Sequence, residues 1–219
     1  EPDWHVYWKN PGVSGAATEI EVFAPEGFKV GEPVFPRPTI IQTTDGPTYG
    51  YGDLAAIFIP VTAPDLIKEE PVTFKILTMW LACKKTCVLG ESETDLTLAM
   101  NSETRGPLHK DLRLSKWQKR LPKELNLLKE GSCRIVESDL MISGVVGDQA
   151  VTFIGVERRG VRFKGQISTT STEGKFTLTV PLVLEYSPII PEAIEVEGLL
   201  LLGSNPDGDS YVIRATAEP

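Results

Sequence analysis

Residues 72–90 read VTFKILTMWLACKKTCVLG, a β-rich run followed by two closely spaced cysteines. The first part, Val72–Ala82, is rich in β-branched and aromatic residues, which favour a strand. Cys83 and Cys87 follow and enclose the three residues Lys84-Lys85-Thr86. A second strand leaving at Val88 would make this segment the tip of a β-hairpin.

Similar short β-rich runs are spread along the first half of the chain and are bounded by turn sequences such as Asp45-Gly46-Pro47. These runs are Glu19–Phe23, Leu54–Thr62 and Thr94–Met100. Short strands at fairly regular spacing are typical of a β-sandwich. Residues 25–38 hold four prolines, which have no N–H to donate to a ladder, so this segment is expected to be loop or edge strand.

From Asp111 to Gly131 the hydrophobic pattern becomes helical. One apolar stripe recurs at steps of 3, 4, 4 and 3 through Leu114, Trp117, Leu121, Leu125 and Leu128. Asp111 is placed to cap the start and Gly131 to end the helix. Pro122 is expected to kink it or to start a second short helix. The segment 111–132 is therefore predicted to be an amphipathic helical connector.

After the connector, apolar and polar residues again alternate with a period of two. It runs through Val161, Phe163 and Ile167, through Phe176, Leu178, Val180, Leu182 and Leu184, and through Ile194 and Val196. Such one-sided strands are typical of an antiparallel sheet with one wet face. We therefore expect an all-β protein with three parts: a β domain over 1–110, the helical connector over 111–132, and a second, smaller β-sandwich over 133–219. The second β domain offers no candidate site.

Composition narrows the function. The 219 residues carry 22 Lys plus Arg against 30 Asp plus Glu, a net charge of −8 with no basic block, which argues against nucleic-acid binding. The longest apolar run, Leu54–Val61, is far shorter than the ~20 residues of a membrane span. The chain begins Glu1-Pro2 without a Met or a signal peptide, so we expect a mature or trimmed fragment.

The cysteine pair can form a bridge only if its loop is a tight turn. Four steps along an extended strand span ~13 Å, whereas a disulfide needs Cα atoms about 4.4–6.8 Å apart. A five-residue loop would contribute only about 2 kcal/mol to stability, yet its bridge would be accessible to an attacking thiolate. Lys84 and Lys85 are cations beside the thiols and favour the thiolate, the species that exchanges.

Other interpretations of the three cysteines stay open at this point. The two alternatives for Cys83 and Cys87 are a pair of buried free thiols and half of a metal site. Zinc would need two more ligands, and the remaining candidates, His5, His109 and Cys133, have no ligand spacing, so we expect no metal. No organic cofactor is expected either. Cys133 is the odd thiol, and a buried inert side chain is its default interpretation.

Three blocks of the sequence together resemble a known family. Trp80–Gly90 (WLACKKTCVLG) is similar to the active-site segment in the amino-terminal periplasmic domain of DsbD-type thiol:disulfide interchange proteins, and more closely to the branch of ScsB-like copper-tolerance reductases. His5–Gly15 (HVYWKNPGVSG) resembles the opening of that domain, and Tyr49–Gly52 (YGYG) its Y-G-Y segment. The resemblance covers about residues 5 to 100, and Trp117–Pro122 (WQKRLP) resembles the stretch that follows.

The resemblance implies an immunoglobulin-like fold and a role in electron transfer. The cysteine pair would take electrons from a transmembrane electron-donor domain and pass them, through thioredoxin-like partners, to periplasmic proteins. Cys87 would form the mixed disulfide and Cys83 would resolve it. An aromatic cap loop made of Tyr49, Gly50 and Tyr51 would shield the pair, whereas without the resemblance Tyr49 and Tyr51 are interpreted as core or edge aromatics between glycines. The sequence departs from the family pattern at Leu89, where a proline is usual.

Four further residues are expected to support the pair, namely Lys84, Lys85, Trp80 and Tyr7. Trp80 lies three residues before Cys83 and is expected either in the core or as a floor under the disulfide. His5 is expected either to assist proton transfer, since its unperturbed pKa is near 6.5, or to be a structural histidine.

The sequence thus predicts a periplasmic thiol:disulfide exchange module that acts as a protein-disulfide reductase domain. The alternative is a non-enzymatic module: a β-sandwich for interactions outside the cytoplasm, or a site for Cu(I), which thiolates bind well. In the alternative, the 83–87 bridge would be a minor structural staple.

Overall fold

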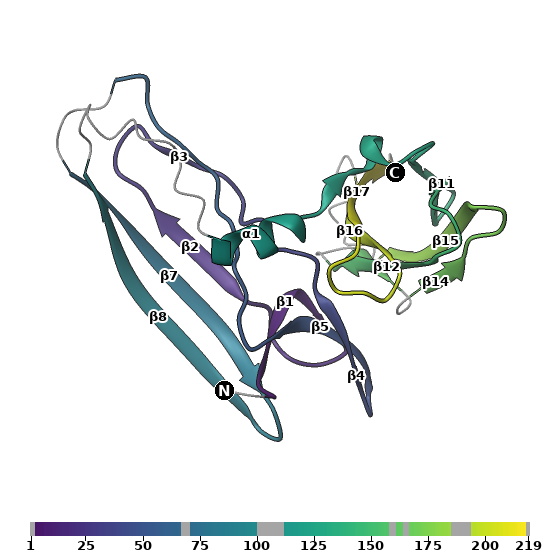
Figure 1. The fold of residues 1–219 in the computed structure, drawn as a ribbon, viewed down its shortest axis with the longest axis horizontal. Helices are drawn as coiled ribbons and strands as arrows, with labels where there is room; N and C mark the ends of the chain where they lie inside the picture. The colour runs from purple at the N-terminus through teal and green to yellow at the C-terminus, as the bar shows by residue number, and fades with distance from the viewer. Residues whose placement is uncertain are drawn as a thin grey trace. The chain divides into compact units, whose positions relative to one another are not determined.

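The structure is a computed structural model that describes residues 3–66, 71–99, 112–157, 161–163, 167–184 and 194–217. The chain divides into two compact units, Glu1–Lys119 and Arg120–Pro219, which are described in turn (Figure 1). Across the described ranges, no helix is long and apolar enough to cross a membrane.

The first unit is built on an antiparallel sheet around its long central strand β7 (Val72–Cys83). The strand order is β2 (Glu19–Phe23), β7, β1 (His5–Gly12), β5 (Gly46–Gly52) and β4 (Thr39–Thr43), and β8 (Cys87–Leu98) also pairs with β7. A separate ribbon joins β3 (Lys29–Val30) to β6 (Val61–Thr62). The expected all-β, immunoglobulin-like architecture is confirmed. The proline-rich segment 25–38 is loop apart from the short strand β3 and an isolated antiparallel bridge between Val34 and Phe58.

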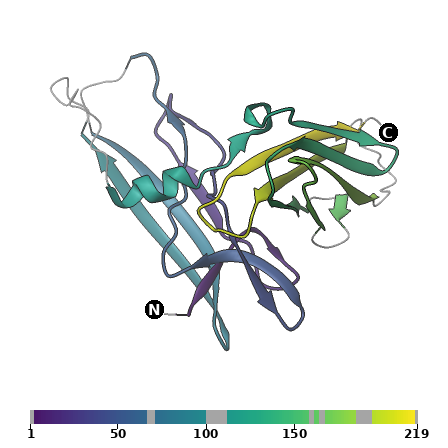
Figure 2. The same ribbon diagram turned by 45° about the vertical axis from the view of Figure 1, so that its right-hand side comes forward.

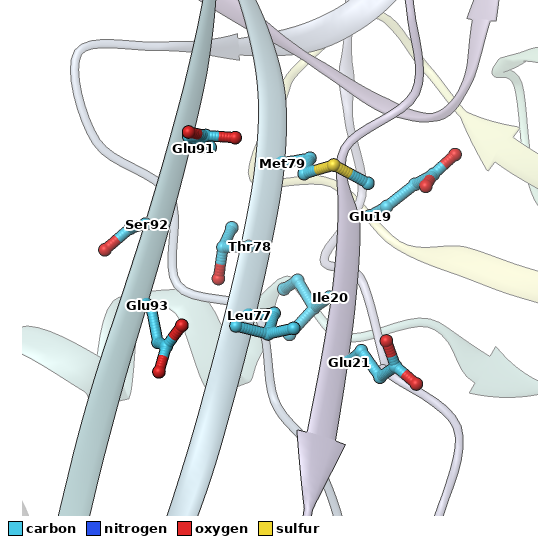
Figure 3. Close-up of a pocket in the computed structure, with 9 residues that line it drawn as sticks. All are labelled: Glu19, Ile20, Glu21, Leu77, Thr78, Met79, Glu91, Ser92 and Glu93. Atoms are coloured by element: carbon cyan, nitrogen blue, oxygen red, sulfur yellow. The ribbon is translucent and has the colours of Figure 1, made fainter.

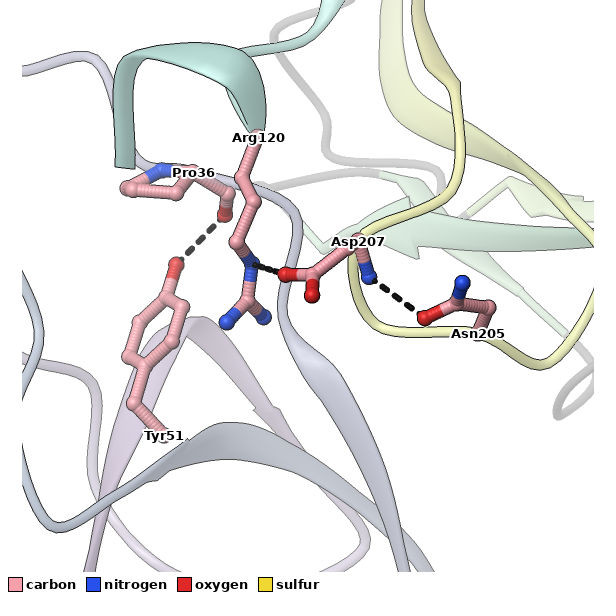
Figure 4. A network of polar contacts seen from close by, with 5 residues as sticks. All are labelled: Pro36, Tyr51, Arg120, Asn205 and Asp207. Carbon is pink, nitrogen blue, oxygen red and sulfur yellow. Dashed lines mark hydrogen bonds and ion pairs between the residues drawn. The ribbon is translucent and has the colours of Figure 1, made fainter. Parts of the chain in front are cut away.

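Aromatic side chains fill the interior of this unit. The buried ones include Tyr7, Trp8, Tyr49, Tyr51 and Phe74. The hydroxyl of Tyr51 donates a hydrogen bond of 2.6 Å to the carbonyl of Pro36 (Figure 4). The ring of Tyr51 also packs edge-on against Trp117, with centroids 6.1 Å apart. Trp117 lies on α1 (Leu112–Lys119), so this helix is part of the first unit's packing.

The predicted helix over 111–131 is much shorter than expected. It ends at Lys119, because Pro122 disfavours helical backbone at the residue before it and cannot donate an N–H. The chain continues as β9 (Lys123–Glu124) and a single 3₁₀ turn, Leu125–Leu127. The apolar stripe therefore does not form one face, since Leu128 is buried in the core of the second unit. Asp111 lies outside the described residues.

The second unit consists of two sheets that enclose one core (Figures 1 and 2). One has the order β10 (Ser132–Val136), β11 (Asp139–Val145), β15 (Lys175–Leu184), β13 (Val161–Phe163). The other has the order β14 (Ile167–Thr170), β12 (Ala150–Val156), β16 (Ile194–Leu202), β17 (Ser210–Ala217), β9. Only the pairing of β9 with β17 is parallel among the described pairs of this unit.

The alternation predicted for this unit is found in its strands. Phe176, Leu178, Val180 and Leu182 all point into the core from β15, and each is buried. Between β16 and β17 the chain turns at Asn205, whose side chain accepts a hydrogen bond of 3.0 Å from the backbone N–H of Asp207. The Asp207 carboxylate lies 3.9 Å from Nε of the buried Arg120 (Figure 4).

Candidate functional site at the tip of a β-hairpin

The two cysteines lie at the tip of the hairpin formed by β7 and β8. The strands pair without a shift from Val72↔Leu98 to Cys83↔Cys87. Lys84 closes the tip by donating its backbone N–H to the carbonyl of Thr86 at 3.1 Å. This is the tight turn that a bridge between the two cysteines requires.

Cys83 and Cys87 are joined by a disulfide, with their Cα atoms 4.1 Å apart. The two ends of the bridge differ in access. Cys83 is 4% exposed, whereas Cys87 is an exposed residue on the edge strand. In thiol–disulfide exchange, access decides which sulfur is attacked. Cys87 is therefore the more accessible residue of the bridged pair.

Strand β1 covers the buried end of the bridge. His5 is the direct cross-strand partner of Cys83, and Val6 is the partner of Ala82. The His5 ring packs edge-on against Tyr7, two residues along the same face, with centroids 5.3 Å apart. Burial lowers the pKa of His5 and raises the pKa of Tyr7, so both groups are held neutral near pH 7.

The two lysines of the tip are exposed. The ammonium of Lys84 lies 3.1 Å from the carboxylate of Asp3, so this carboxylate offsets part of the positive charge beside the cysteines. Asp3 was not among the residues that the sequence singled out. Its position beside the hairpin tip depends on β1 pairing with β7, which local patterns do not show.

Trp80 does not lie under the disulfide. It pairs with Gly90, and successive residues of a strand point to opposite faces, so Trp80 and Cys83 lie on opposite faces of the hairpin. A Cβ atom on Gly90 would come within 2.3 Å of the Trp80 ring. The indole therefore covers the backbone of Gly90. The expectation that Trp80 forms a floor under the disulfide is wrong.

The segment of Tyr49, Gly50 and Tyr51 is not a loop in this structure. It is the middle of strand β5, paired on one side with β1 and on the other with β4. Both tyrosines are buried, and a Cβ on Gly50 would lie 2.2 Å from the Val6 carbonyl oxygen. The cap loop that the family resemblance implied is thus replaced by a buried strand, in which Gly50 allows the close approach of β1. Burial raises the pKa of Tyr49 to about 12.

Residues 1–99 match the model of the N-terminal domain of the thiol:disulfide interchange protein DsbD. The resemblance to the DsbD family is confirmed for this stretch, which contains Cys83 and Cys87. The fold of the whole chain is similar to the N-terminal periplasmic domain of ScsB from Proteus mirabilis, with a TM-score of 0.58 and 17% sequence identity. The alignment covers 100% of this chain and 83% of that chain. No curated protein matches the chain significantly.

Proposed function

We propose that this chain is a periplasmic module for thiol:disulfide exchange, in which Cys87 makes and breaks the bond with the partner and Cys83 closes the bridge. The observation that carries the proposal is the unequal access of the two sulfurs in a domain that matches the DsbD N-terminal family. An exposed Cys87 next to a buried Cys83 directs attack to one sulfur and leaves the other as the resolving group.

The reaction needs no cofactor. A partner thiolate attacks Sγ of Cys87, the S–S bond breaks, and Cys83 leaves as a thiolate that takes up a proton. The second thiol of the partner then attacks the mixed disulfide, so the partner is oxidised by two electrons and the Cys83/Cys87 pair is reduced. In the second half, the Cys87 thiolate attacks a substrate disulfide and Cys83 resolves the product, which returns the bridge and reduces the substrate.

Electrons would run from a membrane-associated reductase domain, through Cys83 and Cys87, to thioredoxin-like periplasmic proteins. The similarity to a periplasmic domain of ScsB supports this location. Lys84 and Lys85 would favour the thiolates by their charge, and the neutral His5 and Tyr7 next to Cys83 would limit access of water to the leaving sulfur.

The reduction potential of the pair tests the function. The protein is equilibrated in glutathione or dithiothreitol buffers, and the alkylated thiols are counted by mass spectrometry. The Cys133→Ser variant is used, so that only the thiols of Cys83 and Cys87 are counted. Exchange proteins have potentials between about −180 and −270 mV. A value well below about −300 mV would indicate a structural bridge and would contradict the proposal.

Trapping tests the division of roles between the sulfurs. In the same background, Cys83→Ser incubated with glutathione disulfide is expected to accumulate a mixed disulfide between Cys87 and glutathione, with release of one reduced glutathione. Cys87→Ser is the matched variant and leaves only the buried thiol, so it is expected to form the adduct many times more slowly. Equal trapping by the two variants, or the reverse order, would refute the assignment.

A further inference from the structure

We propose that the outer face of strands β2, β7 and β8 is the surface on which the exchange partner docks, and that the docking segment of the partner is apolar with Lys or Arg on both sides. The inference rests on the proposed function and names the kind of partner that the same site takes. It is drawn from the register of the three strands, the exposure of their side chains and their charges.

The face is laid out in rows by the pairing of the strands. Met79 lies between Glu19 of β2 and Glu91 of β8, and Leu77 lies between Glu21 and Glu93. Direct partners in an antiparallel sheet project to the same face, so each row consists of an apolar side chain with a carboxylate on either side. Figure 3 shows the glutamates on the two outer strands, β2 and β8, and Leu77 and Met79 on the central strand β7.

This face is hollowed and open. A depression of about 520 Å³ is lined by residues of all three strands, with Leu77 and Met79 among them. Met79 is 50% exposed, although it sits in the middle strand of the three, where a side chain is normally covered. An apolar floor with a charged rim of a single sign is the arrangement that selects a partner by both shape and charge.

Most of the acidic charge on the rim is uncompensated. Glu93 forms an ion pair of 2.5 Å with Lys75. Among the residues that the structure describes, no lysine or arginine is paired with Glu19, Glu21 or Glu91. A segment that brings Lys or Arg to the rim would gain attraction at each of these positions, and its apolar side chains would cover Met79 and Leu77.

The same face leads directly to the disulfide. The row above Met79 is Leu81↔Leu89, and the next same-face row is Cys83↔Cys87. Leu89 is 74% exposed, so it extends the apolar strip toward Cys87. Four residues along a strand span about 13 Å, so a partner segment of four or five residues reaches from Cys87 to the hollow. A partner that reacts at Cys87 therefore passes over this face.

The experiment compares three disulfide probes in their reaction with the reduced protein in the Cys133→Ser background. One is a peptide disulfide with Leu flanked by Lys, the second is the same peptide with Glu in place of Lys, and the third is hydroxyethyl disulfide, which is small and uncharged. We expect the basic peptide to react at least about fivefold faster than the acidic one at low salt. This preference should shrink as salt screens the charges.

Two variant pairs locate the preference on the face. Glu19→Gln/Glu91→Gln should remove most of the advantage of the basic peptide, and Glu26→Gln/Glu32→Gln, an equal charge change at exposed positions elsewhere, should leave it. Met79→Ala should slow both peptides, while Val61→Ala, an exposed apolar residue on β6, should not. The rate with hydroxyethyl disulfide should be the same in all of these proteins.

The outcomes separate this inference from the function on which it rests. If none of the probes exchanges, hydroxyethyl disulfide included, the proposed function fails. If all exchange but the two peptides react equally, or the Glu19/Glu91 variant behaves like its matched control, the docking face is refuted while the function stands.

Discussion

His5 and Cys83 lie directly opposite each other on adjacent antiparallel strands, with Gly52 on the other side of His5. The cysteine is thus separated from β5 by a single histidine. The His5 ring is half-buried and packs on Tyr7. Because this environment favours the neutral imidazole, protonation of His5 should weaken the fold around the buried end of the bridge.

Stability should therefore fall as the pH is lowered below 6.5. Burial lowers the pKa of His5 from its ordinary value of 6.5, so the unfolded chain binds this proton first. Stability from this residue is present above pH 6.5 and is lost as the pH falls toward the lowered pKa of the folded state. Urea unfolding at pH 5, 6 and 7 measures the slope. His5→Gln should flatten it, and an unchanged slope would show that His5 does not contribute.

The contact of Trp80 with Gly90 predicts a large effect from a small substitution. In Gly90→Ala the new methyl would overlap the indole ring, which must then move, at a cost of about 1–3 kcal/mol in the free energy of unfolding. Gly52→Ala is the matched control, because its Cβ would meet nothing closer than the Trp4 carbonyl oxygen at 3.9 Å. Chemical denaturation compares the two. Equal stabilities would mean that the ring is not fixed on the glycine.

Cys133 should be a slow thiol. Burial raises the pKa of Cys133, and its Sγ–H donates a hydrogen bond of 3.1 Å to the Arg214 carbonyl. Since the thiolate is the nucleophile, the folded protein should react with iodoacetamide at pH 8 more slowly than the urea-unfolded protein does. Mass spectrometry of the oxidised protein, in which Cys83 and Cys87 are bridged, isolates this one thiol. Equal rates would contradict the prediction.

In the second unit, Gly198 supports the packing of Phe153. A Cβ on Gly198 would lie 2.3 Å from the Phe153 ring and 2.8 Å from the Ile154 carbonyl oxygen. Gly198→Ala should cost about 1–3 kcal/mol of stability. Phe153→Leu should relieve part of this cost, because the ring is gone and the two changes are not independent. Strictly additive effects in the double variant would show that the ring is not the obstacle.

Local patterns predicted much of the fold because one-sided burial forces a period of two on strands. Phe176–Leu182 shows this most clearly, since its alternate residues are all buried. The length of the helix was overestimated because the same kind of apolar periodicity continues past the residue at which the helix ends. Leu125 and Leu128 keep the helical spacing, but they pack with the core of the second unit after Pro122 has ended the helix.

Within the candidate site, the sequence located the hairpin and its cysteines but not their surroundings. Tyr49 and Tyr51 alternate at the period of a strand, whereas the cap loop was expected only from the family resemblance. The partnership of His5 with Cys83 and the pairing of Glu19 and Glu21 with β7 arise between strands far apart in the sequence. Such a register is set by the whole sheet and leaves no short-range signal.

In the hairpin, strand β7 is hydrogen-bonded to other strands along both edges, whereas β8 is hydrogen-bonded along one edge. β7 is bordered by β1 and β2 along one edge and by β8 along the other, whereas within the described residues β8 pairs with β7 alone. Hydrogen–deuterium exchange should therefore be slow for the backbone amides along β7. Along β8, amides that exchange slowly should alternate with amides that exchange fast. A protein that adds a strand to the free edge would slow the fast set, while one that rests on the glutamate-lined face would leave that alternation intact.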